Sequence, residues 1–166
     1  MQKKPVLSIS LLVSDRPDTI QRCLDSLNTI RENITSELII VNTSHSENVR
    51  AIIEKYTDKI VDFEWCDDFA KARNAGLSLA TGEWFLTLDD DEWFVEVQPL
   101  LDFFQSGEYR RYGCANYLVR NFYDIKYRHY SDAWVSRMIR LSKDTHYESK
   151  IHEYLYPVHG ECRNIE

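Results

Sequence analysis

Four consecutive acidic residues follow one apolar segment of this 166-residue chain. Asp89, Asp90 and Asp91 come directly after the apolar run at 84–88, and Glu92 completes the cluster. The run is typical of a buried strand, so the carboxylates at its end repel one another unless a cation or solvent relieves them. Carboxylate oxygens suit Mg²⁺, Mn²⁺ or Ca²⁺. The cluster therefore predicts a hard-metal site, with a solvated acidic turn as the alternative.

The position of this cluster also predicts a ligand. It follows a strand whose predecessor is a helix ending at Thr81 and Gly82. In open α/β sheets, ligands bind outside the carboxyl ends of strands. A site with one or two protein carboxylates leaves coordination positions for phosphate oxygens and water, which favours a nucleoside diphosphate.

Two further groups of residues are candidates for nucleotide contacts. Asn42, Thr43 and Ser44 end an apolar run and can hydrogen-bond a base or ribose, or they simply open the next helix. Arg73 lies about one turn into a helix that Asp68 can cap. Its guanidinium can grip a diphosphate bidentately, or it is an ordinary surface arginine.

A late pair of residues has the chemistry of catalysis. His152 can supply a metal ligand and Glu153 a general base. The alternative is that the pair merely forms a polar strand end.

The elements that must position these residues alternate between strand and helix patterns. Continuous apolar runs indicate buried strands, and apolar residues at i, i+3, i+4 and i+7 indicate helices. The predicted strands lie at 6–13, 38–41, 60–65 and 84–88, and the helices lie at 17–27, 49–56 and 68–79. This rhythm predicts a mostly parallel sheet covered on both faces. After Pro99 the pattern suits antiparallel strands or loops with one wet face, which predicts a smaller antiparallel C-terminal lobe. We expect one domain over 1–166, with a nucleotide-sugar half at 1–98 and an acceptor half at 99–166.

Composition excludes several classes of protein. The formal net charge of −7 argues against a nucleic-acid partner, because such proteins cluster Lys and Arg against phosphates. No apolar stretch approaches the ~20 residues of a membrane span. The cysteines are widely spaced without a C-x-x-C pair, which predicts reduced thiols and a cytoplasmic protein; they are Cys23, Cys66, Cys114 and Cys162.

Taken in order, these segments resemble a bacterial family-2 glycosyltransferase with the GT-A fold. The run at 6–27 resembles the first strand and helix of that family, 37–47 its second strand and nucleotide loop, and 68–74 its donor-side helix. Residues 88–92 stand where the family has its D-x-D metal motif, and Arg137 and 151–153 resemble late signature positions.

The resemblance implies roles for particular residues. The implied nucleotide-sugar ligands are Val13, Asp15, Asn42, Asp68, Arg73, Asp89 and Asp90. The implied metal ligands are Asp89, Asp91 and His152, and the implied catalytic residues are Asp91 and Glu153. The family usually has Asp where this chain has Asn42, and Gly-Ser where it has Ser44-His45, so the loop is stiffer here.

These observations predict an enzyme that uses Mg²⁺ or Mn²⁺ to move a sugar from a nucleoside diphosphate, with UDP favoured. The acceptor is a saccharide, a lipid-linked molecule or a protein, and inversion at the anomeric carbon is implied by the resemblance. The rival hypothesis is a non-catalytic or truncated domain that binds sugar nucleotides or a partner. A third option, another Mg²⁺-dependent phosphoryl enzyme, would normally carry its D-x-D after the first strand rather than the fourth.

Overall fold

The computed structural model describes residues 4–124 and 126–165 and is built on one seven-stranded sheet. Its strands lie in the order β3-β2-β1-β4-β6-β5-β9. Four of them run parallel: β1 (Leu7–Val13), β2 (Ser36–Asn42), β3 (Ile60–Asp62) and β4 (Trp84–Asp89). Because they are parallel, their carboxyl ends meet at one edge, and β4 delivers Asp89 there.

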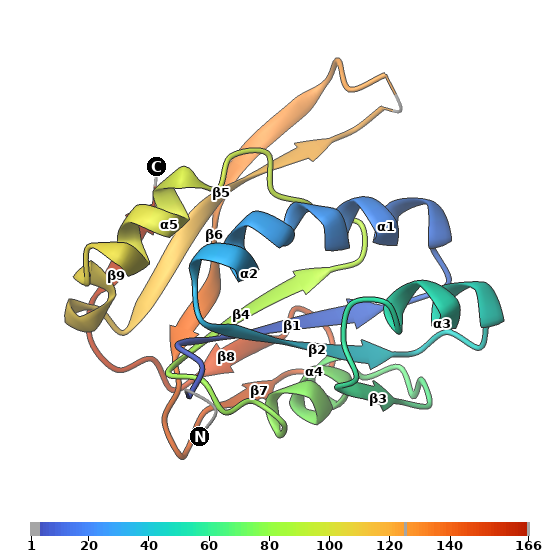
Figure 1. The fold of residues 1–166 in the computed structure, drawn as a ribbon, viewed down its shortest axis with the longest axis horizontal. Coiled ribbons are helices and arrows are strands. Elements are labelled where there is room, and N and C mark those ends of the chain that lie inside the picture. The colour runs from blue at the N-terminus through green and yellow to red at the C-terminus, as the bar shows by residue number, and fades with distance from the viewer. Residues whose placement is uncertain (1–3, 125, 166) are drawn as a thin grey trace.

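Helices cover both faces of this sheet (Figure 1). They are α1 (Pro17–Ser26), α2 (Asn28–Asn33), α3 (Glu47–Ile53), α4 (Phe69–Leu77), α5 (Gln98–Gln105) and the short 3-10 helix η1 (Glu108–Arg111). The larger core cluster joins one sheet face to α1, α2, α3 and α5, whereas α4 packs on the other face. The predicted three-layer α/β/α fold is confirmed. Within the described residues, no helix is long and apolar enough to cross a membrane.

Helix α4 approaches the sheet closely because Gly76 faces it. A Cβ atom added to Gly76 would lie 2.6 Å from Ser10 Oγ and 2.7 Å from a methyl group of Val41. No larger residue fits there without displacing the helix. This close packing brings Arg73, one turn earlier in α4, against the end of β4.

The C-terminal strands extend the same sheet. The strands β5 (Cys114–Phe122) and β6 (Tyr130–Arg140) are antiparallel, and β6 pairs antiparallel with β4. Their distal part projects beyond the body of the protein (Figure 1). The strand β9 (Cys162–Ile165) runs parallel to β5. A separate two-stranded antiparallel sheet is formed by β7 (His146–Glu148) and β8 (Tyr154–Tyr156).

Two helices were not predicted from the sequence. Helix α5 buries Leu100, Leu101, Phe103 and Phe104, but its short apolar run comes directly after Pro99, where the helical rhythm was expected to end. Helix α2 follows α1 almost without a break and buries a single residue, Ile30. A helix as short as α2 with a single buried position carries little periodic signal.

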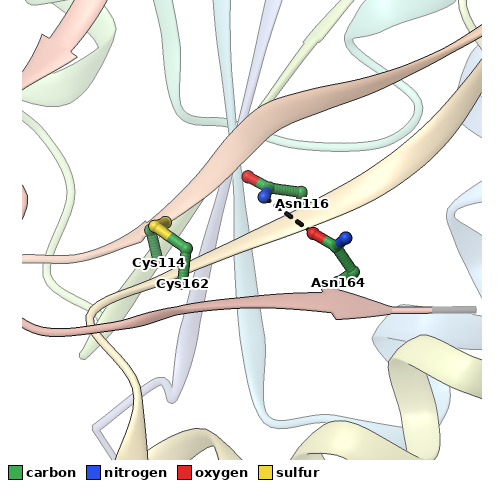
Figure 2. The surroundings of a disulfide bond; sticks show 4 residues. All are labelled: Cys114, Asn116, Cys162 and Asn164. Atoms are coloured by element: carbon green, nitrogen blue, oxygen red, sulfur yellow. Dashed lines mark hydrogen bonds between the residues drawn. A yellow bond between two sulfur atoms is a disulfide. The ribbon is translucent and has the colours of Figure 1, made fainter.

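A disulfide corrects the prediction of reduced thiols. Cys114 and Cys162 lie directly opposite each other in the parallel pair β5 and β9, with their Cα atoms 4.5 Å apart, and their sulfur atoms are bonded. Figure 2 shows the bond beside a hydrogen bond from Asn116 Nδ2 to Asn164 Oδ1. The cysteines are 48 residues apart, so only strand pairing brings them together.

The other two cysteines are free, Cys23 buried and Cys66 exposed. Disulfides are rare in reducing compartments. The expectation of a cytoplasmic protein therefore loses the support it drew from the cysteines.

Candidate functional site at the carboxyl ends of the strands

The buried member of the acidic cluster, Asp90, joins the end of β4 to the end of β1. Its Oδ2 accepts hydrogen bonds from the backbone N–H of Ser14 at 2.7 Å and from the Ser14 hydroxyl at 2.8 Å. Burial raises the pKa of Asp90, although the two Ser14 hydrogen bonds oppose that shift. Asp90, an implied nucleotide ligand, therefore lies inside the protein as a clamp between two strand ends.

Asp91 points to solvent instead. Its side chain is 48% exposed and forms an ion pair with Nη1 of Arg16, which comes from the loop between β1 and α1. The same Nη1 lies 3.5 Å from Asp90 Oδ1. Of the three aspartates, Asp91 is the one whose carboxylate is most accessible.

Arg73 is buried, so the alternative that it is an ordinary surface arginine is wrong. Its side chain is only 4% exposed, and each guanidinium nitrogen has a protein acceptor. Nε donates to Glu153 Oε1 at 2.6 Å, Nη1 to Thr87 Oγ1 at 3.0 Å, and Nη2 to Asp89 Oδ1 at 2.7 Å. Burial alone lowers the pKa of Arg73, but the charges of Asp89, Tyr147 and Glu153 outweigh burial and raise it.

Arg73 thus brings two of the predicted residues to one place. Asp89 and Glu153 are held on the same guanidinium, although Glu153 lies in the segment just before β8. Glu153 therefore lies at the acidic cluster and is held there through Arg73. In this structure the donors of Arg73 are directed at these two partners and at Thr87.

Glu92 and Arg137 complete the network. Arg137 projects from β6, and its Nη2 lies 2.8 Å from Glu92 Oε1 and 3.4 Å from Asp89 Oδ2. The backbone N–H of Asp89 donates to Glu92 Oε2 at 3.1 Å. Burial raises the pKa of Glu92, and Arg137 opposes this shift. Sequence reasoning did not assign Glu92 a role, because its partner comes from a distant strand.

The network carries an excess of negative charge. Five carboxylates face three guanidinium groups, a formal balance of minus two; the groups are Asp89, Asp90, Asp91, Glu92, Glu153, Arg16, Arg73 and Arg137. All the acceptors are hard oxygen donors, which fits Mg²⁺ or Mn²⁺. In the described part of the chain, no three His, Cys, Asp or Glu side chains are gathered as a ready metal cage. The arrangement therefore fits an ion that one or two carboxylates hold together with a ligand.

His152 lies apart from these ion pairs. It is exposed, has a left-handed backbone with φ of 56°, and takes part in none of the ion pairs found among residues 4–124 and 126–165. The structure brings Glu153 to the network through Arg73 but provides no such link for its neighbour.

The end of β2 differs in chemistry. Asn42 is buried, and its Nδ2 donates to the Ser44 carbonyl at 3.1 Å and to Asp62 Oδ1 at 2.9 Å. Its Oδ1 accepts from the Ser44 backbone N–H at 3.1 Å. The amide is therefore satisfied by the protein itself.

Three implied nucleotide ligands remain to be placed. Val13 is a core residue whose carbonyl accepts from the backbone and hydroxyl of Thr43. Asp15 is exposed, with its Oδ1 3.5 Å from Ser44 Oγ. Asp68 is the N-cap of α4, where its carboxylate accepts from the Lys71 backbone N–H at 3.0 Å, as the sequence predicted. Asp15 is the one with an accessible carboxylate.

Two hollows of the protein lie away from this network. A cavity of about 690 Å³ opens beside Gly82 and Leu141, at the amino end of β4, and one of about 260 Å³ lies between α5 and β9. No residue of the acidic network lines either of them. The candidate site is defined by its charges and by the strand topology, and neither cavity belongs to it.

Comparison with known proteins assigns the fold and the family. The model of one protein family, described as Glycosyl transferase family 2, matches residues 8–158. A curated relative, the SPbeta prophage-derived glycosyltransferase SunS of Bacillus subtilis, is 24% identical over 159 residues, covering 90% of this chain and 34% of SunS. The chain spans only 21% to 36% of the length of the curated relatives that it matches.

Solved structures agree in fold. TarS 1-349 of S. aureus in complex with UDP-GlcNAc has a TM-score of 0.55 and 22% identity, over 67% of this chain and 33% of that TarS chain. The mannosyltransferase PcManGT of Pyrobaculum calidifontis, in complex with GDP-Man and Mn²⁺, has a TM-score of 0.56 and 19% identity, over 72% of this chain and 36% of that protein. Because the family match extends over most of its length, this chain belongs to glycosyl transferase family 2.

Proposed function

We propose that this chain is the donor-binding catalytic domain of a glycosyltransferase that takes a sugar from a nucleoside diphosphate with the help of Mg²⁺ or Mn²⁺. The observation that carries the proposal is the excess negative charge at the carboxyl end of β4, in a family 2 fold. A divalent ion supplies the charge that stabilises a departing diphosphate. Asp91 and Asp89 are the residues that would hold it, Asp91 because its carboxylate is accessible.

Glu153 is the proposed general base. Arg73 holds its Oε1, so Oε2 is the oxygen available to accept the proton of an acceptor hydroxyl. A base on the acceptor side is consistent with direct displacement and inversion. In this proposal residues 1–98 bind the donor and residues 99–166 contribute the acceptor side.

The nucleotide is proposed to lie across the ends of β1 and β2. The exposed carboxylate of Asp15 is the side chain there that can reach a ligand, because the Asn42 amide is already paired. We favour UDP, which the TarS complexes contain, and treat GDP, which accompanies mannose in PcManGT, as the comparison nucleotide.

A specific observation favours the rival, a non-catalytic binding domain. Each carboxylate of the acidic network already has an arginine partner or a hydrogen-bond donor of the protein. The two hypotheses make the same prediction for nucleotide binding and differ for transfer. The experiments therefore have to measure both.

The first experiment measures binding of UDP and GDP by calorimetry with Mn²⁺ and with EDTA. We expect Asp91→Asn to abolish the Mn²⁺-dependent part of UDP affinity, because the most accessible carboxylate is lost. Asp132→Asn is the control, since Asp132 also pairs with an arginine but lies on the projecting strands. UDP affinity that is unchanged in Asp91→Asn, or in wild-type protein with EDTA, would refute the metal site.

The second experiment separates catalysis from binding. Glu153→Gln keeps an oxygen for Arg73 Nε, so donor and Mn²⁺ binding should be retained while donor turnover falls by the ~10²–10⁴-fold typical of a lost general base. Glu148→Gln, a change at a half-exposed position in β7, is the control. Equal turnover in wild type and Glu153→Gln would favour the non-catalytic domain.

The predicted metal role of His152 is tested alongside. His152→Ala should weaken Mn²⁺ affinity before it affects turnover if the imidazole completes the metal shell. Unchanged Mn²⁺ affinity would remove His152 from the ligand set and leave the carboxylates alone.

A further inference from the structure

The three arginines of the acidic network are held in very different ways. Arg73 is 4% exposed with an acceptor for each guanidinium nitrogen, and Arg137 is 22% exposed between Asp89 and Glu92. Arg16 is 52% exposed, and its ion pairs involve only Nη1. Removing Arg73 or Arg137 would leave largely buried carboxylates without a counter-charge. Arg16 alone can leave at little cost, because an exposed ion pair contributes at most about 1 kcal/mol.

The backbone beneath Arg16 is fixed, so only its side chain has to move. The Arg16 N–H donates to the Ser14 carbonyl at 3.0 Å, and the Arg16 carbonyl accepts from Thr19 and Ile20 at the start of α1. Ser14 is itself held by Asp90. Because Pro17 follows at the first position of the helix, the conformation of this turn is further restricted.

Arg16 occupies the carboxylate that the proposed function assigns to the metal. Its Nη1 pairs with Asp91 Oδ2 and lies 3.5 Å from Asp90 Oδ1. A guanidinium and a divalent ion on one carboxylate repel each other at close range. A diphosphate brings the opposite charge to the same edge of the sheet, and a guanidinium fork matches phosphate oxygens well.

We infer that Arg16 is a displaceable counter-cation, which neutralises Asp91 in the empty protein and, once a divalent ion takes Asp91, turns its guanidinium to the donor diphosphate. This inference rests on the proposed function and adds to it a residue with two alternating partners. It gives a reason for the pairing of the exposed carboxylate of Asp91 with Arg16. It also predicts effects of opposite sign on the binding of metal and nucleotide.

The test is calorimetry on Arg16→Gln with two probes, Mn²⁺ alone and UDP in saturating Mn²⁺. Without the competing guanidinium, Mn²⁺ should bind roughly two- to fivefold more tightly, the range equivalent to an exposed ion pair. UDP should bind about tenfold or more weakly, because charged hydrogen bonds to phosphate are lost. Arg16→Lys keeps a charge but makes a point contact, so both shifts should be smaller.

The matched control is Arg120→Gln. Arg120 is 48% exposed and pairs with Asp132 on the projecting strands, so the change in net charge and exposure is nearly the same. We expect it to leave both affinities unchanged. Equal shifts in Arg16→Gln and Arg120→Gln would show a general charge effect and overturn the inference.

The remaining outcomes separate this inference from the proposed function. Wild-type protein that binds Mn²⁺ and UDP, with an Arg16→Gln variant that binds Mn²⁺ no more tightly, overturns the inference alone. If Arg16→Gln binds UDP as tightly as the wild type or more tightly, the proposed contact between Arg16 and the diphosphate is overturned. Wild-type protein that binds neither probe overturns the proposed function, and the inference falls with it.

Discussion

The carboxyl ends of β2 and β4 lie in the same sheet, on either side of β1, and both end in polar residues. At the end of β2, Asn42 satisfies its amide with Ser44, two residues away, and with Asp62. At the end of β4, Asp89 is paired with Arg73 and Arg137, which come from α4 and β6.

The difference shows what makes a strand end a candidate site. At the β2 end, the donors and the acceptor of the Asn42 amide are all paired within the protein, so these polar groups stabilise a turn. The β4 end retains an excess of carboxylates over guanidinium groups and has one accessible member, Asp91. Both strand ends lie at the carboxyl edge of the sheet. The uncompensated negative charge distinguishes the β4 end, and such a charge favours binding of a cation.

The largest loss of stability should come from replacing Arg73, the central residue of the network at the β4 end. Arg73→Met removes a buried guanidinium and leaves Asp89 and Glu153 without its charge, so the free energy of unfolding should fall by about 3–5 kcal/mol. Urea denaturation at neutral pH measures this. Arg120→Met, which breaks an exposed pair, should cost no more than about 1 kcal/mol. A similar small loss in Arg73→Met would mean that the network is not a structural unit.

A smaller effect should come from charging the β2 end. Asn42→Asp replaces the Nδ2 donor with an oxygen that faces Asp62 Oδ1 and the Ser44 carbonyl, so we expect a loss of about 1–3 kcal/mol at pH 7. In the wild type, the hydrogen bond from Asn42 is the main cause that lowers the pKa of Asp62.

The same variant has a distinctive pH dependence. The introduced carboxyl has a raised pKa beside Asp62, so its stability deficit should shrink as the pH falls and the carboxyl becomes protonated. Asn121→Asp on the exposed part of β5 serves as the control. A stable Asn42→Asp variant with enhanced UDP affinity would show that the side chain at position 42 is open to ligand after all.

The smallest effect concerns the buried clamp Asp90. Its pKa is raised in the folded protein by burial, so its contribution to stability is fully present below its ordinary pKa of 3.8 and is lost as the pH rises through the folded-state value. Asp90→Asn keeps an acceptor for Ser14 but does not titrate. Relative to wild type, the variant should therefore gain stability as the pH rises from about 4 toward neutrality.

Urea denaturation across that pH range tests the slope, and the pKa of Asp90 is raised even with the opposing charge of Arg16 included. Glu92, whose pKa is also raised, is present in both proteins and cancels. If the free energies of unfolding of the two proteins change in parallel with pH, ionisation of Asp90 does not destabilise the folded protein.

Local pattern in the sequence determined the scaffold and the place of the site. The apolar runs and helical spacing predicted the four parallel strands and the helices α1, α3 and α4, because burial on one or both faces leaves a periodic trace. The carboxylates at 89–92 follow an apolar strand, so their position at a sheet edge could be predicted. Asp68 was predicted as a helix cap because that hydrogen bond spans only three residues.

Only the tertiary structure decided which partners these residues have. Arg73 and Glu153 are 80 residues apart, Arg16 and Asp91 are 75 apart, and Arg137 and Asp89 are 48 apart. The disulfide between Cys114 and Cys162 likewise depends on the pairing of β5 with β9. Spacing along the chain carries no record of such contacts, because they arise when strands and helices pack and bring distant charges within hydrogen-bond distance. The sequence therefore determined that the end of β4 is acidic, while the packing decided that Arg73 is internal, that the Asn42 amide is paired within the protein and that Asp91 is held by an exposed arginine.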